Sequence, residues 1–227
     1  MTTHLPGTRE AQAVGASLIL APAFLLGSAL ALPKLDSDYL VTASAHHSGY
    51  YAFVMLGAVA ALLLIPACYG LARIVGHRHP RLAAIGGTLA VGGTALSLMD
   101  GGTDLVKWQM VTGGADRDQM KALNDRLDNA AGVAAPLQLS GMALLVGLLL
   151  LAIGLRRARA VPTWVAIGLF VGMFVNITGF AASSVAILAV GAGVLLASMG
   201  WIGIRTLRDA TAAAPAFAPA PAPLGLS

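Results

Sequence analysis

The feature that most constrains this chain is a series of six apolar stretches, each close to the length that crosses a lipid bilayer. A helix needs about 20 apolar residues to cross the hydrocarbon layer. The stretches are continuous rather than alternating, which indicates helices instead of β-strands. The third stretch reaches a full span only if its helix continues past Asp100. The expected spans are residues 13–32, 50–71, 82–99, 134–155, 161–180 and 185–204.

The composition also indicates a membrane environment. Of the 227 residues, 57% are hydrophobic and 11% are charged, and the mean hydropathy is +0.80. Soluble domains carry about 45–50% apolar and about 25% charged residues, and they could not cover so much apolar surface. We therefore expect an all-α, polytopic transmembrane helix bundle over residues 13–208. A short segment, 1–12, precedes it, and an Ala/Pro-rich tail, 209–227, is expected to be disordered.

The distribution of charge predicts the orientation. One side of the expected bundle carries nine basic and two acidic residues, whereas the other carries five basic and eight acidic residues. Short loops rich in arginine stay in the cytoplasm. Both termini are thus predicted to be cytoplasmic, with residues 33–49 and 107–133 outside the plasma membrane. The basic residues are expected to meet anionic lipid headgroups and not nucleic acid.

Two segments allow further predictions. In the loop 107–133, residues 118–128 could form a short helix with an apolar stripe of Met120, Leu123 and Leu127. The first span resembles a signal peptide, because small residues precede Pro33. The even number of spans with both ends inside favours a retained helix.

Small residues predict where the helices pack, since helices in lipid approach closely where side chains are small. The fifth span carries Gly168 and Gly172 on one stripe, which continues to Asn176. We expect Asn176 to make an interhelical hydrogen bond. The sixth span has a similar stripe of Ala189, Gly193 and Ala197.

Polar residues of the spans gather toward the outer side and form the candidate site. The predicted ligand-binding residues are Asp100, Gln138, Asn176 and Tyr50. A carboxylate in partly dry surroundings is costly and tends to be kept for ion or substrate handling. Because Asp100 is one turn deeper than Asp104, we expect it to face the bundle interior while Asp104 lies nearer water. The alternative is that these are ordinary polar helix ends.

Three functions remain open from the sequence. The first is binding or moving a small or lipid-like molecule at this outward-facing polar site, with membrane lipids as the surroundings. The second is an enzyme that uses Asp100 or Asp104 as general acid on a lipid or isoprenoid substrate, with His46 or His47 as the base. The third is an accessory membrane subunit without a site of its own.

No cofactor and no metal site are predicted. The sequence has no Cys/His metal spacing, no P-loop and no dinucleotide fingerprint. His46 and His47 are adjacent, and neighbouring residues on a helix point about 100° apart, so one metal rarely takes both.

The layout resembles that of small six-helix bacterial membrane proteins classified as domains of unknown function. The shared features are six spans in some 200 residues, a long polar outer loop and the Arg156-Arg157-Ala158-Arg159 sequence before the fifth span. The resemblance covers residues 10–208 and implies a fold and a compartment but no activity.

The predicted orientation can be tested by cysteine labelling. In a Cys68→Ala background, an impermeant thiol reagent added to intact cells should label Asp116→Cys and leave Arg157→Cys unlabelled. We expect this pattern because position 116 is predicted to lie in an outer loop and position 157 in a cytoplasmic loop. The reverse pattern would overturn the orientation.

Overall fold

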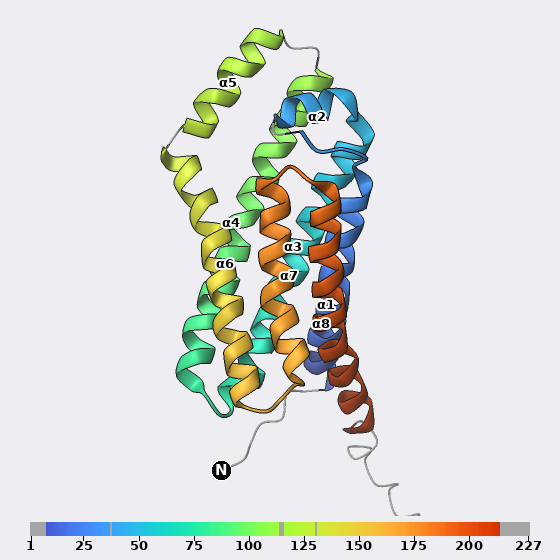
Figure 1. Ribbon diagram of the computed structural model, residues 1–227, viewed down its shortest axis with the longest axis vertical. Helices are drawn as coiled ribbons and strands as arrows, with labels where there is room; N and C mark the ends of the chain where they lie inside the picture. Colours follow the sequence, from blue (N-terminus) through green and yellow to red (C-terminus); the bar gives the residue numbers. More distant parts are fainter. Residues whose placement is uncertain (1–7, 37, 114–115, 130, 214–227) are drawn as a thin grey trace, which may run out of the picture.

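Helices make up all the regular structure of the described chain, and no strand occurs there (Figure 1). The computed structural model describes residues 8–36, 38–113, 116–129 and 131–213. The helices are α1 Thr8–Ala31, α2 Tyr39–Ala45, α3 His47–Gly76, α4 Pro80–Thr112, α5 Arg117–Asn129, α6 Ala131–Arg157, α7 Thr163–Ala181 and α8 Val185–Ala213.

Six of these helices are long and apolar enough to cross a membrane, which confirms the predicted all-α bundle of six spans. They are α1, α3, α4, α6, α7 and α8. α4 continues past Asp100 to Thr112, so the third span has its full length and the first residues of the predicted outer loop are helical. The short helix expected within that loop is present as α5. Leu127 was predicted to belong to the apolar stripe of this helix, but its side chain is not among those that the structure describes.

The prediction of a disordered tail from residue 209 is wrong for its first residues. α8 continues to Ala213, because alanine is the strongest helix former and no proline occurs between Val185 and Pro215. Residues 214–227 lie outside the described part of the chain.

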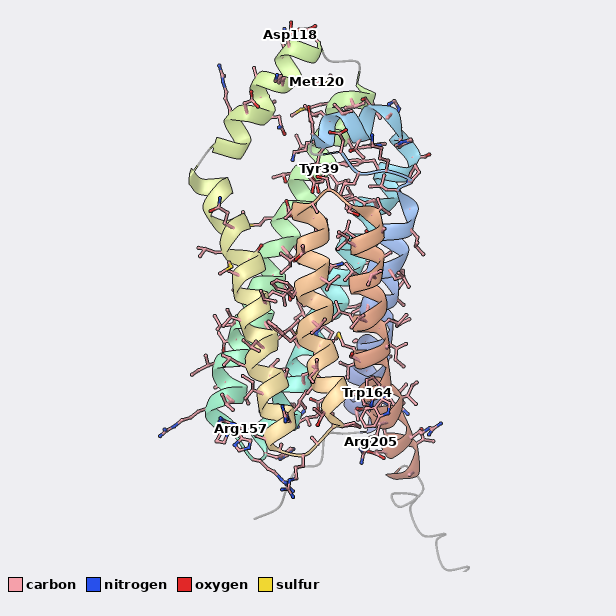
Figure 2. The ribbon with its side chains drawn as sticks, viewed as in Figure 1. Tyr39, Asp118, Met120, Arg157, Trp164 and Arg205 are labelled. Carbon is pink, nitrogen blue, oxygen red and sulfur yellow. The ribbon has the colours of Figure 1, made fainter. Side chains whose placement is uncertain are left out.

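The six spans form a closed ring in the order α1, α3, α4, α6, α7, α8 and back to α1. The two ends of the described chain lie together at one end of this ring (Figure 1). Figure 2 places Arg157 and Arg205 there, and we call it the basic end. The opposite end carries α2 and α5, with Asp118 and Met120 at the far tip of the view, and we call it the acidic end.

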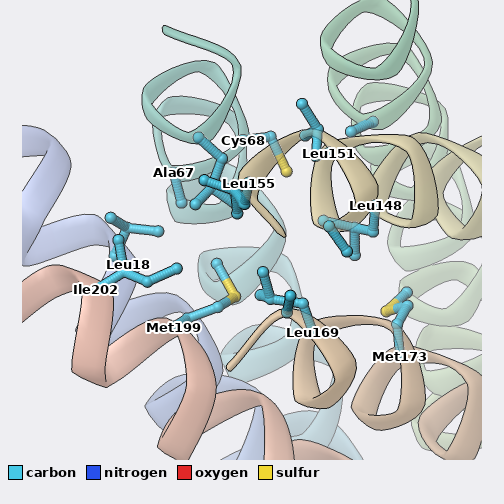
Figure 3. Close-up of a cluster of buried hydrophobic side chains, with 14 of the residues drawn as sticks. Leu18, Ala67, Cys68, Leu148, Leu151, Leu155, Leu169, Met173, Met199 and Ile202 are labelled. Carbon is cyan, nitrogen blue, oxygen red and sulfur yellow. The ribbon is translucent and has the colours of Figure 1, made fainter. Parts of the chain in front are cut away.

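The half of the bundle toward the basic end has a filled core. Leu151, Leu155 and Leu169 are fully buried there, and Cys68 and Met199 pack with them (Figure 3). Polar contacts at this end add to the packing. Arg78 Nη1 donates a hydrogen bond to the carbonyl oxygen of Ala158 at 2.9 Å. Arg73 forms an ion pair with Glu10.

α7 and α8 approach each other closely along the predicted glycine stripe. A Cβ atom added at Gly172 would lie 2.9 Å from the backbone nitrogen of Leu195. One added at Gly191 would lie 2.5 Å from the backbone nitrogen of Asn176. Asn176 is buried, and its Nδ2 donates to the carbonyl oxygen of Leu188 at 3.2 Å. The predicted interhelical hydrogen bond of Asn176 is confirmed.

The stripe expected on α8 is wrong at two of its three positions. A Cβ atom at Gly193 would meet nothing within 4 Å, and Ala197 is exposed. The face of α8 that packs on α7 instead carries Leu188, Gly191 and Leu195. Four-residue spacing occurs on several faces of a helix rich in small residues, so spacing alone does not identify the packed face.

Gly172→Leu should destabilise the protein by about 1–3 kcal/mol, because the new side chain would have to displace the backbone of α8. Thermal unfolding in detergent would measure the loss. Gly193→Leu is the matched control, since it adds the same side chain on α8 where there is open space. Equal stability of the two variants would contradict the packing described here.

Candidate functional site

A cavity of about 310 Å³ lies between the six spans. Its volume is at the lower end of the range of small-molecule sites, about 300–1,000 Å³. Each of the six spans contributes lining residues, so the cavity occupies the centre of the ring. The polar lining residues are Ser28, Ser97, Asp100, Asp104, Ser140 and Asn176.

The lining changes in character along the bundle axis. The deep part is formed by large apolar side chains, including Leu64, Leu148 and Met199. The polar residues lie in those halves of their helices that point to the acidic end, as the chain direction of each span in Figure 1 shows. The cavity therefore has an apolar depth, and all its described polar lining residues lie toward the acidic end, which we call its mouth, where Phe53 and Phe180 also line it.

Besides Asn176, two serines of the lining donate hydrogen bonds to backbone carbonyls. Ser28 Oγ donates to Phe53 O at 2.8 Å and joins α1 to α3, and Ser97 Oγ donates to Thr94 O at 2.7 Å. A hydroxyl oxygen that donates one hydrogen bond still has lone pairs that can accept others. These side chains can thus support the helices and contact a ligand at the same time.

A buried ion pair stands beside the mouth of the cavity. Lys107 Nζ lies 3.5 Å from Asp104 Oδ1, and the two side chains are 9% and 14% exposed. The ammonium also lies 5.1 Å from the centre of the Tyr39 ring, a cation–π distance. Burial, followed by the nearby carboxylates of Asp104 and Asp100, raises the pKa of Tyr39, which holds its phenol neutral. Tyr39 belongs to α2, so this short helix packs against the Lys107–Asp104 pair (Figure 2).

The predicted order of burial of the two aspartates is wrong. Both line the cavity, but Asp104 is the enclosed one and Asp100 is exposed. The prediction counted depth along one helix only. It did not include α2, which was not predicted and which brings Tyr39 over the outer turn of α4.

Tyr50 is fully buried behind the mouth and is not among the described lining residues. Among the described residues its hydroxyl has no partner that meets hydrogen-bond geometry. Nearby, Trp108 Nε1 donates to the carbonyl oxygen of His47 at 3.1 Å, and the Tyr51 ring lies 4.9 Å from the Trp108 ring. These contacts hold the outer turns of α3 and α4 together.

The remaining predicted site residues lie elsewhere. His46 sits between α2 and α3, and His47 begins α3 with an exposed side chain. Gln138 is exposed at the acidic half of α6. None of these three is among the described residues that line the cavity, which include no histidine. An acid–base pair requires both groups at one substrate position, so the cavity does not supply the histidine base of the enzyme hypothesis. Within the described ranges, no three His, Cys, Asp or Glu side chains are grouped to hold a metal.

The all-helical fold, with six helices long and apolar enough to cross a membrane, defines a multi-pass integral membrane protein. Comparison of the chain with protein-family models, curated proteins and solved structures gives no match. The resemblance to small bacterial six-helix proteins stays a prediction, and the function has to be argued from the cavity itself.

Lys107→Met should destabilise the protein by about 3 kcal/mol, because it leaves the enclosed Asp104 carboxylate without its ion-pair partner. Combining it with Asp104→Asn should recover most of the loss, since the second change removes the uncompensated charge. Thermal unfolding in detergent compares the variants, with the exposed Lys121→Met on α5 as control. A double variant no more stable than Lys107→Met would contradict the pairing.

Proposed function

We propose that the protein binds a single-chain amphiphile in its central cavity, with the hydrocarbon chain in the apolar depth and the head at the polar mouth. The observation that carries this proposal is the gradient of the lining, from Leu64, Leu148 and Met199 to the two aspartates. A water-soluble polar ligand would leave the apolar depth unfilled, and a pure hydrocarbon would make no hydrogen bond to the polar side chains at the mouth. The volume of the cavity, about 310 Å³, suits one hydrocarbon chain better than the two chains of a phospholipid.

The residues at the mouth favour a head group that donates hydrogen bonds. A carboxylate accepts hydrogen bonds at about four lone-pair positions, so Asp100 can accept one from a ligand in addition to its existing contacts. Asp100, Asp104 and the ion-paired Lys107 together carry a net negative charge, which would repel a carboxylate or phosphate head. An alcohol or an amine therefore fits the site better than an anion.

The location of the cavity favours binding over passage across the whole membrane. On the side that faces the basic end of the bundle, the cavity stops at the packed core of Leu151, Leu155 and Leu169. With the basic end in the cytoplasm, as the arginine-rich loops favour, the cavity belongs to the outer half of a plasma-membrane protein. The ligand would be taken from, or presented to, the outer leaflet.

The proposal can be tested with a long-chain alcohol that carries a photoreactive diazirine in its chain, reconstituted with the protein in lipid vesicles. Illumination should label cavity residues such as Leu148 and Met173, identified by mass spectrometry of peptides. The matching fatty acid should label them less, because the aspartates repel its carboxylate. Asp100→Asn should reduce this difference.

A pair of adjacent substitutions supplies the matched control. Leu98 lines the cavity, whereas Met99 is exposed on the outside of the same helix. Leu98→Trp should abolish labelling of the cavity residues by filling their space, and Met99→Trp should leave it unchanged. Labelling confined to lipid-facing residues, and unaffected by Leu98→Trp, would refute the proposed function.

A further inference from the structure

The six interfaces of the helix ring differ in how closely their backbones approach. Close approaches at glycine occur in five of them. At Gly93 and Gly147, α4 meets α6, with added Cβ atoms 2.5 and 2.4 Å from backbone nitrogens of the partner helix. At three of the other interfaces a glycine also lies close to backbone atoms of the partner helix: Gly203 for α1–α8, Gly49 for α1–α3 and Gly172 for α7–α8. At the α3–α4 interface an added Cβ at Gly87 would lie 2.8 Å from the side-chain Cβ of Ala72.

The α6–α7 interface is the exception. Among the described glycines of these two helices, the nearest atoms to an added Cβ belong to α3, α4 or α8 and never to each other. α6 and α7 also make the least contact of any neighbouring pair in the ring. Each is thus held mainly by its other neighbour, α6 by α4 and α7 by α8.

The two halves of this interface are unlike. Toward the basic end, Leu148, Leu151 and Leu155 of α6 pack in one buried cluster with Leu169 and Met173 of α7 (Figure 3). Leu148 and Met173 also line the cavity. Toward the acidic end the lining continues with Gly141, where an added Cβ would meet nothing within 4 Å, and with Ile177. Figure 1 shows α6 leaning away from α7 in this half.

The route along the bundle axis is covered at the acidic end. α2 lies over the mouth with Tyr39, and Lys107 and Asp104 are enclosed beneath it. The Trp108 indole is tied to the start of α3. A ligand that arrived from water would have to displace these buried groups, including an ion pair, and would then expose its hydrocarbon chain to water on the way.

We propose that the acidic half of the α6–α7 interface is a lateral opening through which the amphiphile enters the cavity from the hydrocarbon layer of the bilayer. This inference rests on the proposed function and adds to it that the ligand is a membrane-dissolved molecule, not one delivered from water. Entry needs only a separation of α6 from α7 at Gly141 and Ile177. Neither helix has to leave the partner with which its backbone is in close contact.

The experiment restricts this movement with a chemical cross-link. In a Cys68→Ala background, Gly141→Cys and Ile177→Cys place one thiol on each side of the opening, and a flexible bifunctional maleimide joins them. The readout is photolabelling of Leu148 by the diazirine alcohol in vesicles. The reagent is added either before or after the vesicles are loaded with the alcohol.

We expect cross-linking before loading to reduce labelling of Leu148 to the level of an unilluminated sample, and cross-linking after loading to leave it intact. A control cross-link should label normally in both orders. It joins Gly27→Cys and Leu56→Cys at the α1–α3 interface, where an added Cβ at Gly27 lies 3.8 Å from Leu56 Cδ1. Neither residue is among the described lining residues of the cavity.

The outcomes separate the two proposals. Labelling of Leu148 that is the same in both orders would overturn the lateral opening and leave the binding site standing. No labelling of Leu148 in the protein without a cross-link would overturn the binding site, and the opening with it. Loss only when the cross-link precedes loading supports both.

Discussion

The structure depends on the close approach of helix backbones at glycine. In lipid, apolar side chains gain little by meeting each other instead of acyl chains, so helices associate through van der Waals contact and a few hydrogen bonds. At Gly147 and Gly191 the neighbouring backbone is so near that no side chain of any size would fit. These contacts fix the order of the ring, and the polar side chains of the spans then meet at its centre.

The cavity follows from this arrangement and from the size of the residues that face the centre. A ring of six helices surrounds a space that side chains have to fill. Leucine fills it toward the basic end, where Leu151 and Leu155 are fully buried. Toward the acidic end the facing residues are often small, such as Ala58, Ala61 and Gly57, and the space stays open. Large apolar residues close one half of the bundle and small residues leave room in the other.

The sequence predicted the number and type of the spans because each is an unbroken apolar run, a local signal that needs no tertiary information. It also predicted the role of Asn176, a polar residue on a glycine stripe. It failed for the relative burial of Asp100 and Asp104, which depends on α2, a seven-residue helix too short to give a periodic signal. It failed for Gly193 for a related reason, since small residues on α8 mark several faces and only the partner helix selects one.

The uneven distribution of close glycine contacts also bears on how such a protein can diverge. Substitutions at Gly93, Gly147 or Gly191 would disturb the ring itself, so these positions should change little during evolution. In the acidic half of α6, by contrast, an added Cβ at Gly141 meets nothing within 4 Å, so a residue there can change size without displacing a neighbouring backbone. A lineage could therefore acquire a preference for a longer, shorter or more branched hydrocarbon chain there while its fold remained intact.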